Sequence, residues 1–192
     1  MSEAYLVLGC PGSGKTTRAR ALAAEMTAVG AALIVVDTGR VEAFDDMYHA
    51  RSLDELIDVV WEDGDDIAFT PKDGEEFDRL CGAIYGGRNV VLLVDELYNV
   101  VPSVRSIPEN FQRCLRERRR VLAGAVVTSQ LYRDCGRAMK GLVTHILVGR
   151  MTAPEDQADL KADYGLEPER VGQLPPAREN PDGAFIPLKV GF

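Results

Sequence analysis

Eight residues near the amino terminus have the types and spacing of a loop that binds the phosphates of a nucleoside triphosphate. The stretch is Gly9-Cys10-Pro11-Gly12-Ser13-Gly14-Lys15-Thr16, and Thr17 follows it. In such a loop backbone N–H groups surround phosphate oxygens, the lysine reaches the β and γ phosphates, and the hydroxyl beside it ligates Mg²⁺. We therefore expect the stretch and Thr17 to bind nucleotide, with ATP and Mg²⁺ as ligands.

A pair of carboxylates follows the most apolar segment of the chain, residues 89–94. An aspartate after such a strand holds Mg²⁺ opposite the hydroxyl of the phosphate loop, which predicts Thr16 and Asp95 as metal ligands. The adjacent Glu96 can accept a proton from a water in line with the γ-phosphate, which suits a general base for hydrolysis. The alternative is that Asp95 and Glu96 only cap the segment that follows.

Gln130 ends the next apolar segment, residues 121–127 followed by Thr-Ser-Gln. An amide at the tip of a strand can touch both the γ-phosphate and the attacking water. Together with Asp95 and Glu96, it indicates the additional-strand, catalytic-glutamate (RecA-like) division of P-loop ATPases. In that division an extra strand lies between the phosphate-loop strand and the strand that ends in Asp95.

The elements that must position these residues alternate between buried strands and amphipathic helices. Such alternation predicts a three-layer α/β/α fold with a mostly parallel central sheet. Caps are expected at Ser52, Thr70, Ser106 and Thr152. The expected strands are 5–8, 32–37, 67–69, 89–94, 121–127, 144–148 and 184–190, and the expected helices begin near 15, 53, 70, 106 and 152.

Length and composition favour one domain over residues 1–192, with 165–192 as a carboxyl-terminal extension packed on the core. No apolar run approaches the roughly 20 residues that span a bilayer, and no basic leader opens the chain. We therefore expect a cytoplasmic protein without direct membrane insertion. Cys10, Cys81, Cys114 and Cys135 have no metal-ligand spacing and are expected to be reduced thiols. Cys10 is either a thiol activated by the helix amino terminus or a filler of a variable loop position.

Charge is distributed unevenly, although the formal net charge of the chain is −8. Residues 41–80 hold 14 acidic and 3 basic residues, whereas residues 105–150 hold 10 basic and 3 acidic residues. This polarity indicates one face that attracts an anion and another that repels it. A solvated charge run is the alternative.

The order of these motifs resembles the FtsK-HerA superfamily of DNA-pumping ATPases. The resemblance rests on the phosphate loop, on Val91-Leu-Leu-Val-Asp-Glu96, and on Arg116-Glu-Arg-Arg-Arg120 before Ala125-Val-Val-Thr-Ser-Gln130. The tail, with Thr144-His-Ile-Leu-Val-Gly-Arg150 and Gly183-Ala-Phe-Ile186, agrees. Within the superfamily, the chain is most similar to the genome-packaging ATPases of membrane-containing icosahedral viruses and somewhat similar to the assembly ATPases of filamentous phages.

The resemblance implies a homo-oligomeric ring, a hexamer or pentamer, that threads double-stranded DNA and docks on a capsid or membrane protein at a packaging vertex. It also implies an arginine that enters the neighbouring subunit's site and stabilises the charge on the transferred phosphoryl group. Arg119 matches that position best, with Arg116, Arg118 and Arg120 as competitors. DNA contacts would be mainly to phosphates. Arg133, Arg137 and Lys140 are candidate pore residues, although surface solubility explains them nearly as well.

Two other functions remain open at this stage. An assembly or secretion ATPase would act on virion proteins in place of DNA, and a small-molecule phosphotransferase would bind an acceptor tightly and hydrolyse little ATP. No acceptor motif is visible. The base-recognition sequence [NT]-K-x-D of GTPases is absent from the chain, which argues against a GTPase.

Overall fold

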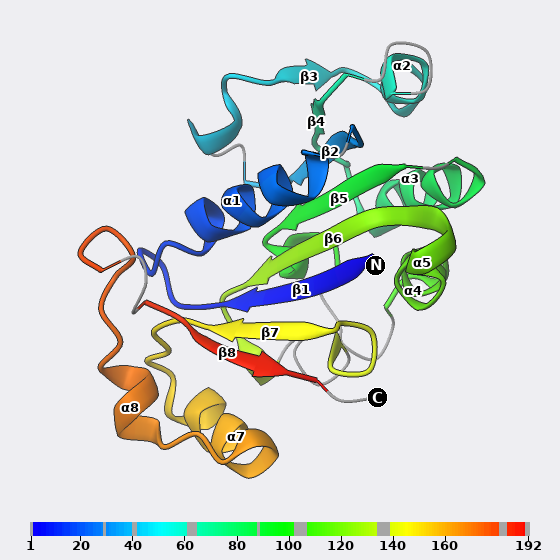
Figure 1. Cartoon of the computed structure of the whole chain (residues 1–192). Helices are drawn as coiled ribbons and strands as arrows, with labels where there is room; N and C mark the ends of the chain where they lie inside the picture. The colour runs from blue at the N-terminus through cyan, green and yellow to red at the C-terminus, as the bar shows by residue number, and fades with distance from the viewer. Residues whose placement is uncertain are drawn as a thin grey trace.

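One mostly parallel sheet forms the centre of the molecule (Figure 1). The computed structural model of the chain describes residues 2–28, 30–39, 42–60, 65–87, 89–101, 107–133, 139–180 and 184–190. The sheet has eight strands in the order β3-β4-β2-β5-β6-β1-β7-β8, and only the β7–β8 pair is antiparallel. The strands are β1 (Glu3–Leu8), β2 (Ala32–Asp37), β3 (Tyr48–Ala50), β4 (Ile67–Phe69), β5 (Val90–Asp95), β6 (Leu122–Ser129), β7 (His145–Val148) and β8 (Ile186–Lys189).

The position of β6 confirms the additional strand predicted from the sequence. β6 pairs in parallel with β1 on one side and with β5 on the other. The phosphate-loop strand and the strand that ends in Asp95 are therefore not neighbours. All six residues of β5 are buried, as expected for a strand covered on both faces.

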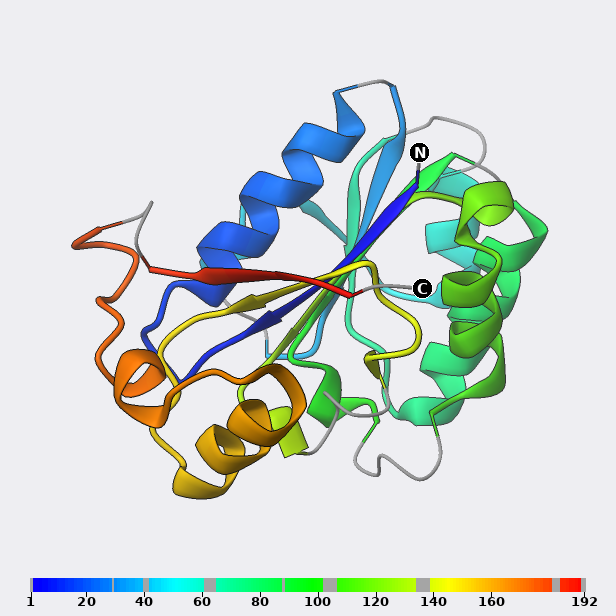
Figure 2. The same ribbon diagram turned by 60° about the horizontal axis from the view of Figure 1, so that its bottom comes forward.

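Helices cover both faces of the sheet, as the three-layer prediction requires (Figure 2). α1 packs on one face, where Ala19, Leu22 and Ala23 meet Val35 and Leu93 of the sheet. The other face is covered by helices whose apolar residues include Leu56, Phe77 and Phe111. The helices are α1 (Lys15–Thr27), α2 (Leu53–Asp58), α3 (Gly74–Gly86), α4 (Glu109–Arg116), α5 (Arg118–Val121), α7 (Pro154–Tyr164) and α8 (Pro168–Gly172), with 3₁₀ turns η1 (Glu42–Phe44) and η3 (Leu97–Asn99).

A glycine in β6 allows α1 to approach the sheet closely. A Cβ atom on Gly124 would lie 2.3 Å from the Sδ atom of Met26 on α1, which is too short for any real contact. The Met26 side chain thus fills the space that a side chain at position 124 would need.

Three of the four predicted helix caps are wrong, and prolines explain two of the errors. The Ser52 hydroxyl accepts a hydrogen bond from the Glu55 N–H, as predicted. α4 and α7 instead begin with Pro108 and Ala153 at the N-cap and without a side-chain cap. A residue before proline is pushed out of helical conformation, so neither Ile107 nor Ala153 can continue a helix that a cap at Ser106 or Thr152 requires. Ser106 itself lies outside the described residues.

The third error is the cap predicted at Thr70, whose hydroxyl binds a strand residue and not the start of a helix. Its hydroxyl donates to the Asp37 carbonyl oxygen at 2.9 Å and so joins the ends of β4 and β2. α3 begins later, with Asp73 accepting from the Glu76 N–H at 2.8 Å. The Glu76 carboxylate in turn accepts from the Lys72 N–H at 2.7 Å, so Glu76 reaches back across the N-cap much as in a capping box.

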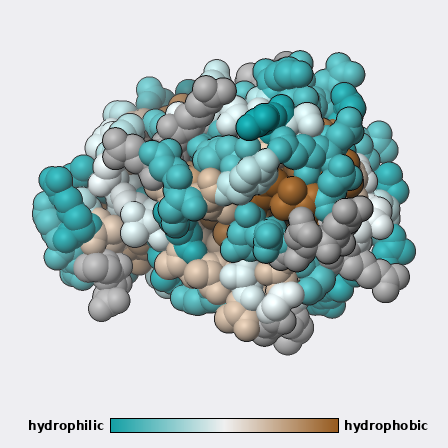
Figure 3. Space-filling model, turned by 90° about the horizontal axis from the view of Figure 1, so that it is seen from above, coloured by the Kyte–Doolittle hydropathy of each residue, from teal (hydrophilic) through white to brown (hydrophobic). Residues whose placement is uncertain are grey.

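The acidic and basic segments meet where α3, whose first half belongs to the acidic segment, packs on α4 of the basic segment. β3, α2 and β4 belong to the acidic segment, and the surface seen from their side is mainly hydrophilic, with one hydrophobic area of limited extent (Figure 3). α4 and α5, which carry most of the described arginines of the basic segment, lie at the amino end of β6 (Figure 1). No helix among the described residues is long and apolar enough to cross a membrane.

Candidate functional site

The phosphate loop turns at two glycines whose backbone is left-handed. Gly12 has φ 76° and Gly14 has φ 88°, and such values favour glycine because it has no Cβ. Gly14 is also the N-cap of α1, so the loop leads directly into the first turn of a helix. The amino terminus of a helix carries unpaired N–H groups and partial positive charge, both of which favour a bound phosphate.

Neighbouring strands hold the loop in place. The Gly9 N–H donates to the Ser129 carbonyl oxygen at 3.2 Å, and the Cys10 N–H donates to the Arg150 carbonyl oxygen at 2.8 Å. The Ser13 side chain is buried, and its hydroxyl has no hydrogen-bond partner among the described residues. A buried hydroxyl without a partner inside such a loop fits a site that receives a polar ligand.

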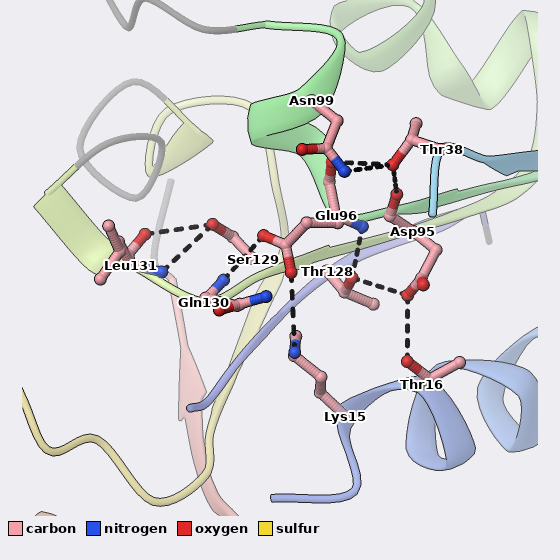
Figure 4. A network of polar contacts seen from close by, with 10 residues as sticks. All are labelled: Lys15, Thr16, Thr38, Asp95, Glu96, Asn99, Thr128, Ser129, Gln130 and Leu131. Carbon is pink, nitrogen blue, oxygen red and sulfur yellow. Dashed lines mark hydrogen bonds and ion pairs between the residues drawn. The ribbon is translucent and has the colours of Figure 1, made fainter. Parts of the chain in front are cut away.

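Lys15 and Thr16 at the start of α1 face Glu96 and Asp95 at the end of β5 (Figure 4). The Thr16 hydroxyl donates to Asp95 Oδ1 at 3.2 Å, and Lys15 Nζ lies 3.6 Å from Glu96 Oε2. Residues 79 and 81 positions apart in the sequence are thereby brought together, as predicted. The hydroxyl and carboxylate oxygens are hard donors of the kind that Mg²⁺ accepts when phosphates complete its shell.

Burial raises the pKa of the Asp95 carboxyl above its ordinary value, although hydrogen bonds from Thr128 and Thr16 and the charge of Lys15 oppose the shift. Asp95 is only 4% exposed. A buried carboxylate needs compensating donors or a cation. The site supplies two hydroxyl donors and one nearby ammonium group, and a Mg²⁺ ion held by Thr16 and Asp95 would add to them.

The backbone of Glu96 is strained in a way that points its carboxylate into the site. Glu96 has φ 56° and ψ 72°, a left-handed conformation that costs on the order of 1–3 kcal/mol for a residue with a side chain. Its N–H donates to the Thr128 hydroxyl at 2.8 Å, and its Oε1 accepts from the Gln130 N–H at 3.1 Å. Glu96 is the N-cap residue of η3, yet its side chain caps nothing. This argues against the alternative that the carboxylate pair serves only as a cap.

Gln130 directly follows β6, and its backbone makes a hydrogen bond within the site. Its N–H fixes Glu96, and Figure 4 shows the residue beside Glu96 at the end of β6. This hydrogen bond therefore links Gln130, which is predicted to sense the γ-phosphate, to Glu96, the predicted general base. The assignment of the Gln130 amide to phosphate and water stays a prediction.

Two side chains of this site were not given roles from the sequence. The Thr128 hydroxyl accepts from the Glu96 N–H and donates to Asp95 Oδ1 at 2.9 Å, so it joins both carboxylate residues. The Thr38 hydroxyl donates to the Asp95 carbonyl oxygen at 2.8 Å and accepts from Asn99 Nδ2 at 2.9 Å. Thr128 lies near the end of β6 and Thr38 directly follows β2, and this position at the carboxyl edge of a parallel sheet is the signal that could have found them.

Arg119 lies away from this group of residues. It is an exposed residue of α5, which precedes β6, whereas Glu96 and Gln130 follow the carboxyl ends of β5 and β6 (Figure 1). Arg119 therefore cannot serve the site of its own chain. Its contribution to a neighbouring subunit stays a prediction.

The other arginines of this cluster differ in their contacts. Arg118 is 8% exposed and donates to the Leu115 and Leu142 carbonyl oxygens at 2.8 and 3.4 Å, which makes it part of the fold. Arg120 donates to the Tyr85 hydroxyl at 2.7 Å and pairs with Glu117 at 3.0 Å. Arg116, Arg119 and Arg120 are exposed, and all four arginines line a cavity of about 490 Å³ beside Gly141.

The candidate pore residues are only partly described. Arg133 is exposed, and its backbone N–H donates to Asp156 Oδ1 at 2.8 Å. Lys140 lies 3.6 Å from Asp163 Oδ1 and 4.7 Å from the centre of the Tyr164 ring, so its charge is engaged within the chain. Arg137 lies outside the described residues. Arg133 is thus the best-placed described candidate of the three.

The phosphate loop, the two carboxylates and the intervening strand β6 define a P-loop ATPase fold. Residues 5–123 match the model of the AAA family, the "ATPase family associated with various cellular activities". The chain belongs to this family. The comparison with curated proteins found no match.

Solved structures with the same fold include a viral packaging enzyme. The genome packaging NTPase B204 from Sulfolobus turreted icosahedral virus 2, in complex with sulfate, has a TM-score of 0.78 at 18% identity, covering 99% of this chain and 92% of that one. Its complex with AMPPCP gives 0.77 at 18% identity, with 98% and 93% coverage. Thermomonospora curvata EccC (ATPases 2 and 3), in complex with a signal sequence peptide, gives 0.51 at 17% identity, covering 79% of this chain and 30% of that one. The predicted resemblance to genome-packaging ATPases is thus confirmed at the level of the fold.

Proposed function

We propose that the chain hydrolyses ATP with Mg²⁺ and uses the energy to move double-stranded DNA, as in the packaging of a viral genome into a capsid. The observation that carries the hydrolytic part is the fixed carboxylate of Glu96. Its strained backbone, the hydrogen bond from Gln130 and the ion pair with Lys15 hold a proton acceptor beside the lysine of the phosphate loop, which supports a role in activating the attacking water. A small-molecule phosphotransferase needs no activated water, and the sequence has no acceptor motif for the carboxylate to serve.

In the proposed mechanism each residue has one task. Lys15 binds the β and γ phosphates, while Thr16 and Asp95 hold Mg²⁺, which neutralises phosphate charge when it is bound. Glu96 takes a proton from the attacking water, and Gln130 orients that water. Arg119 of a neighbouring subunit would stabilise the charge on the transferred phosphoryl group.

Glu96→Gln tests the hydrolytic part. The amide keeps the shape of the side chain but cannot accept the proton, so ATP should still bind while hydrolysis falls by about 10²- to 10⁴-fold. Calorimetry measures the binding, and phosphate release measures turnover. Glu25→Gln, at an exposed glutamate of α1, is the matched control and should behave as wild type. Full activity of the Glu96 variant would remove the general-base assignment.

The proposal that the moved substrate is DNA is supported by the likeness to the genome packaging NTPase, which extends over nearly the whole chain. The likeness to EccC, named a type VII secretion ATPase, supports the alternative of a protein substrate. The experiment that separates them is ATPase rate against protein concentration, with and without duplex DNA, at low and high salt. A DNA motor should turn over faster with duplex at low salt and lose this stimulation steeply as salt rises. Turnover indifferent to duplex at low salt would favour a protein substrate.

A further inference from the structure

The chain that follows Gln130 is bound to α7 at two points. The Tyr132 hydroxyl donates to Asp163 Oδ2 at 2.7 Å. The Arg133 N–H donates to Asp156 Oδ1 at 2.8 Å. Asp156 and Asp163 are seven positions apart on one helix and therefore share one of its faces. Residues 132 and 133 are thus attached to both the first and the last turn of α7.

The hydrogen bond between Tyr132 and Asp163 is shielded from water on the tyrosine side. Tyr132 is fully buried, and its ring packs edge-on against Tyr164, with 6.1 Å between the ring centres. Burial, together with the hydrogen bond to Asp163, raises the pKa of the Tyr132 hydroxyl, so the hydroxyl stays a protonated donor at neutral pH. Lys140 Nζ lies 3.6 Å from the other carboxylate oxygen of Asp163. A hydrogen bond to a charged acceptor is among the stronger kinds, so it fixes the place of Tyr132.

Only Leu131 separates Tyr132 from Gln130, and the backbone of Leu131 is held as well. The Ser129 hydroxyl accepts from the Leu131 N–H at 3.4 Å and donates to the Leu131 carbonyl oxygen at 3.2 Å (Figure 4). The Gln130 N–H in turn donates to Glu96 Oε1 at 3.1 Å. This stretch of backbone therefore has few torsions that can rotate freely, and a shift of Tyr132 is passed on to Gln130.

α7 is itself connected to the phosphate loop. At its first turn, Gln157 Nε2 donates to the Met151 carbonyl oxygen at 2.7 Å. α7 also packs on α8, and beyond α8 the Ala177 N–H donates to the Ser13 carbonyl oxygen at 3.2 Å. One continuous segment thus links the phosphate loop with the chain that follows Gln130.

We propose that Tyr132 is a positioning residue, whose hydrogen bond to Asp163 of α7 holds the Gln130 amide in contact with the γ-phosphate. The inference rests on the proposed function, because it takes Gln130 to contact that phosphate. Gln130 is then held from two sides, by Glu96 at its own N–H and by α7 two residues later. A displacement of Gln130 by about 1 Å slows hydrolysis. ADP has no γ-phosphate, so its binding does not depend on this support.

The test compares the affinities for AMPPCP, an ATP analogue that is not hydrolysed, and for ADP. Tyr132→Phe keeps the buried ring and removes only the hydroxyl. It should lower the ratio of AMPPCP affinity to ADP affinity by about 2- to 10-fold in calorimetry, with ADP affinity unchanged. ATP turnover should fall by about 10- to 100-fold. A purely structural role would lower the unfolding temperature and leave the affinity ratio in place.

Tyr5→Phe is the matched control, because it also removes a hydrogen bond from a tyrosine to a carboxylate. The Tyr5 hydroxyl donates to Glu3 Oε2 at 2.6 Å at the start of β1, far along the strand from the phosphate loop. This variant should change neither the affinity ratio nor turnover.

A double-mutant cycle with Asp163→Ala tests whether the tyrosine acts through α7. If it does, the double variant should lose no more turnover than the more damaged single variant. Asp163→Ala also removes the partner of Lys140, but that loss is common to the single and the double variant. Losses that multiply in the double variant, or an unchanged affinity ratio in Tyr132→Phe, would overturn the inference.

Gln130→Ala separates this inference from the proposed function. If Gln130→Ala keeps the wild-type affinity ratio and turnover, the role of Gln130 in the proposed function fails, and the inference fails with it. If Gln130→Ala lowers both and Tyr132→Phe lowers neither, the proposed function stands and only the inference fails.

Discussion

The Thr128 hydroxyl joins the two carboxylate residues of the site by accepting from the Glu96 N–H and donating to Asp95 Oδ1. The side chain is fully buried, so neither partner can turn to water if the hydroxyl is lost. Glu96 also has the strained backbone, which persists only where its surroundings hold it. We infer that Thr128 is a positioning residue that holds both carboxylates for their separate tasks.

Thr128→Val should therefore damage stability and catalysis together. Valine has nearly the same shape but leaves a buried N–H without a partner, which lowers the free energy of unfolding by about 1–3 kcal/mol. Hydrolysis should fall by about tenfold or more, because Glu96 and Asp95 lose their common anchor. Urea denaturation measures the first effect, and phosphate release well below the unfolding midpoint measures the second.

Thr144→Val is a matched control for this prediction. The Thr144 hydroxyl also accepts from the Ala4 N–H and donates to the Ala4 carbonyl oxygen, each at 2.9 Å, and it lies 3.0 Å from His145 Nδ1. It lies at the amino end of the sheet, far from Glu96 along β1 and β7. The control should lose stability and keep turnover. Equal loss of turnover in both variants would mean that Thr128 acts only through stability.

At the scale of elements, the buried strands and the starts of α1 and α2 were predictable, whereas α3, α4 and α7 begin later than predicted. A continuous apolar run such as residues 32–37 is typical of a strand that is buried on both faces of a parallel sheet. β2 has the predicted bounds. A helix start depends on which of several nearby polar residues is left free by tertiary contacts. The Thr70 hydroxyl donates to the Asp37 carbonyl oxygen, and Asp73 caps α3 instead.

The same distinction applies to the site. Lys15, Thr16, Asp95 and Glu96 could be placed from the sequence, because the carboxyl ends of parallel strands meet at one edge. The contact of Tyr132 with Asp163 could not, because it depends on where α7 packs. A hydrogen bond across 31 residues leaves no local pattern in the sequence.

At the scale of the whole molecule, the site and the exposed arginines lie at opposite ends of the strands. The site follows the carboxyl ends of β5 and β6, and Arg116 and Arg119 precede β6 at its amino end. If the arginine surface of one copy contacts the site of a second copy, the interface joins two different surfaces and is head-to-tail. Such interfaces form a closed ring when the rotation between successive subunits adds up to a full turn. Arg118 is buried and donates to backbone carbonyl oxygens, so three of the four candidate arginines, Arg116, Arg119 and Arg120, remain exposed.

Mixing two inactive variants tests whether the arginine acts between subunits. Arg119→Ala keeps an intact site and lacks the arginine, while Glu96→Gln keeps the arginine and lacks the base, and each alone should lose at least about 10²-fold in turnover. In a random one-to-one mixture, about a quarter of the contacts would pair an intact site with an intact arginine and recover activity. Arg120→Ala should stay active alone, since its partners are Tyr85 and Glu117. If the mixture stays inactive while Arg116→Ala mixed with Glu96→Gln recovers, Arg116 is the residue that crosses the interface; if neither mixture recovers, the arginines do not act on a neighbour.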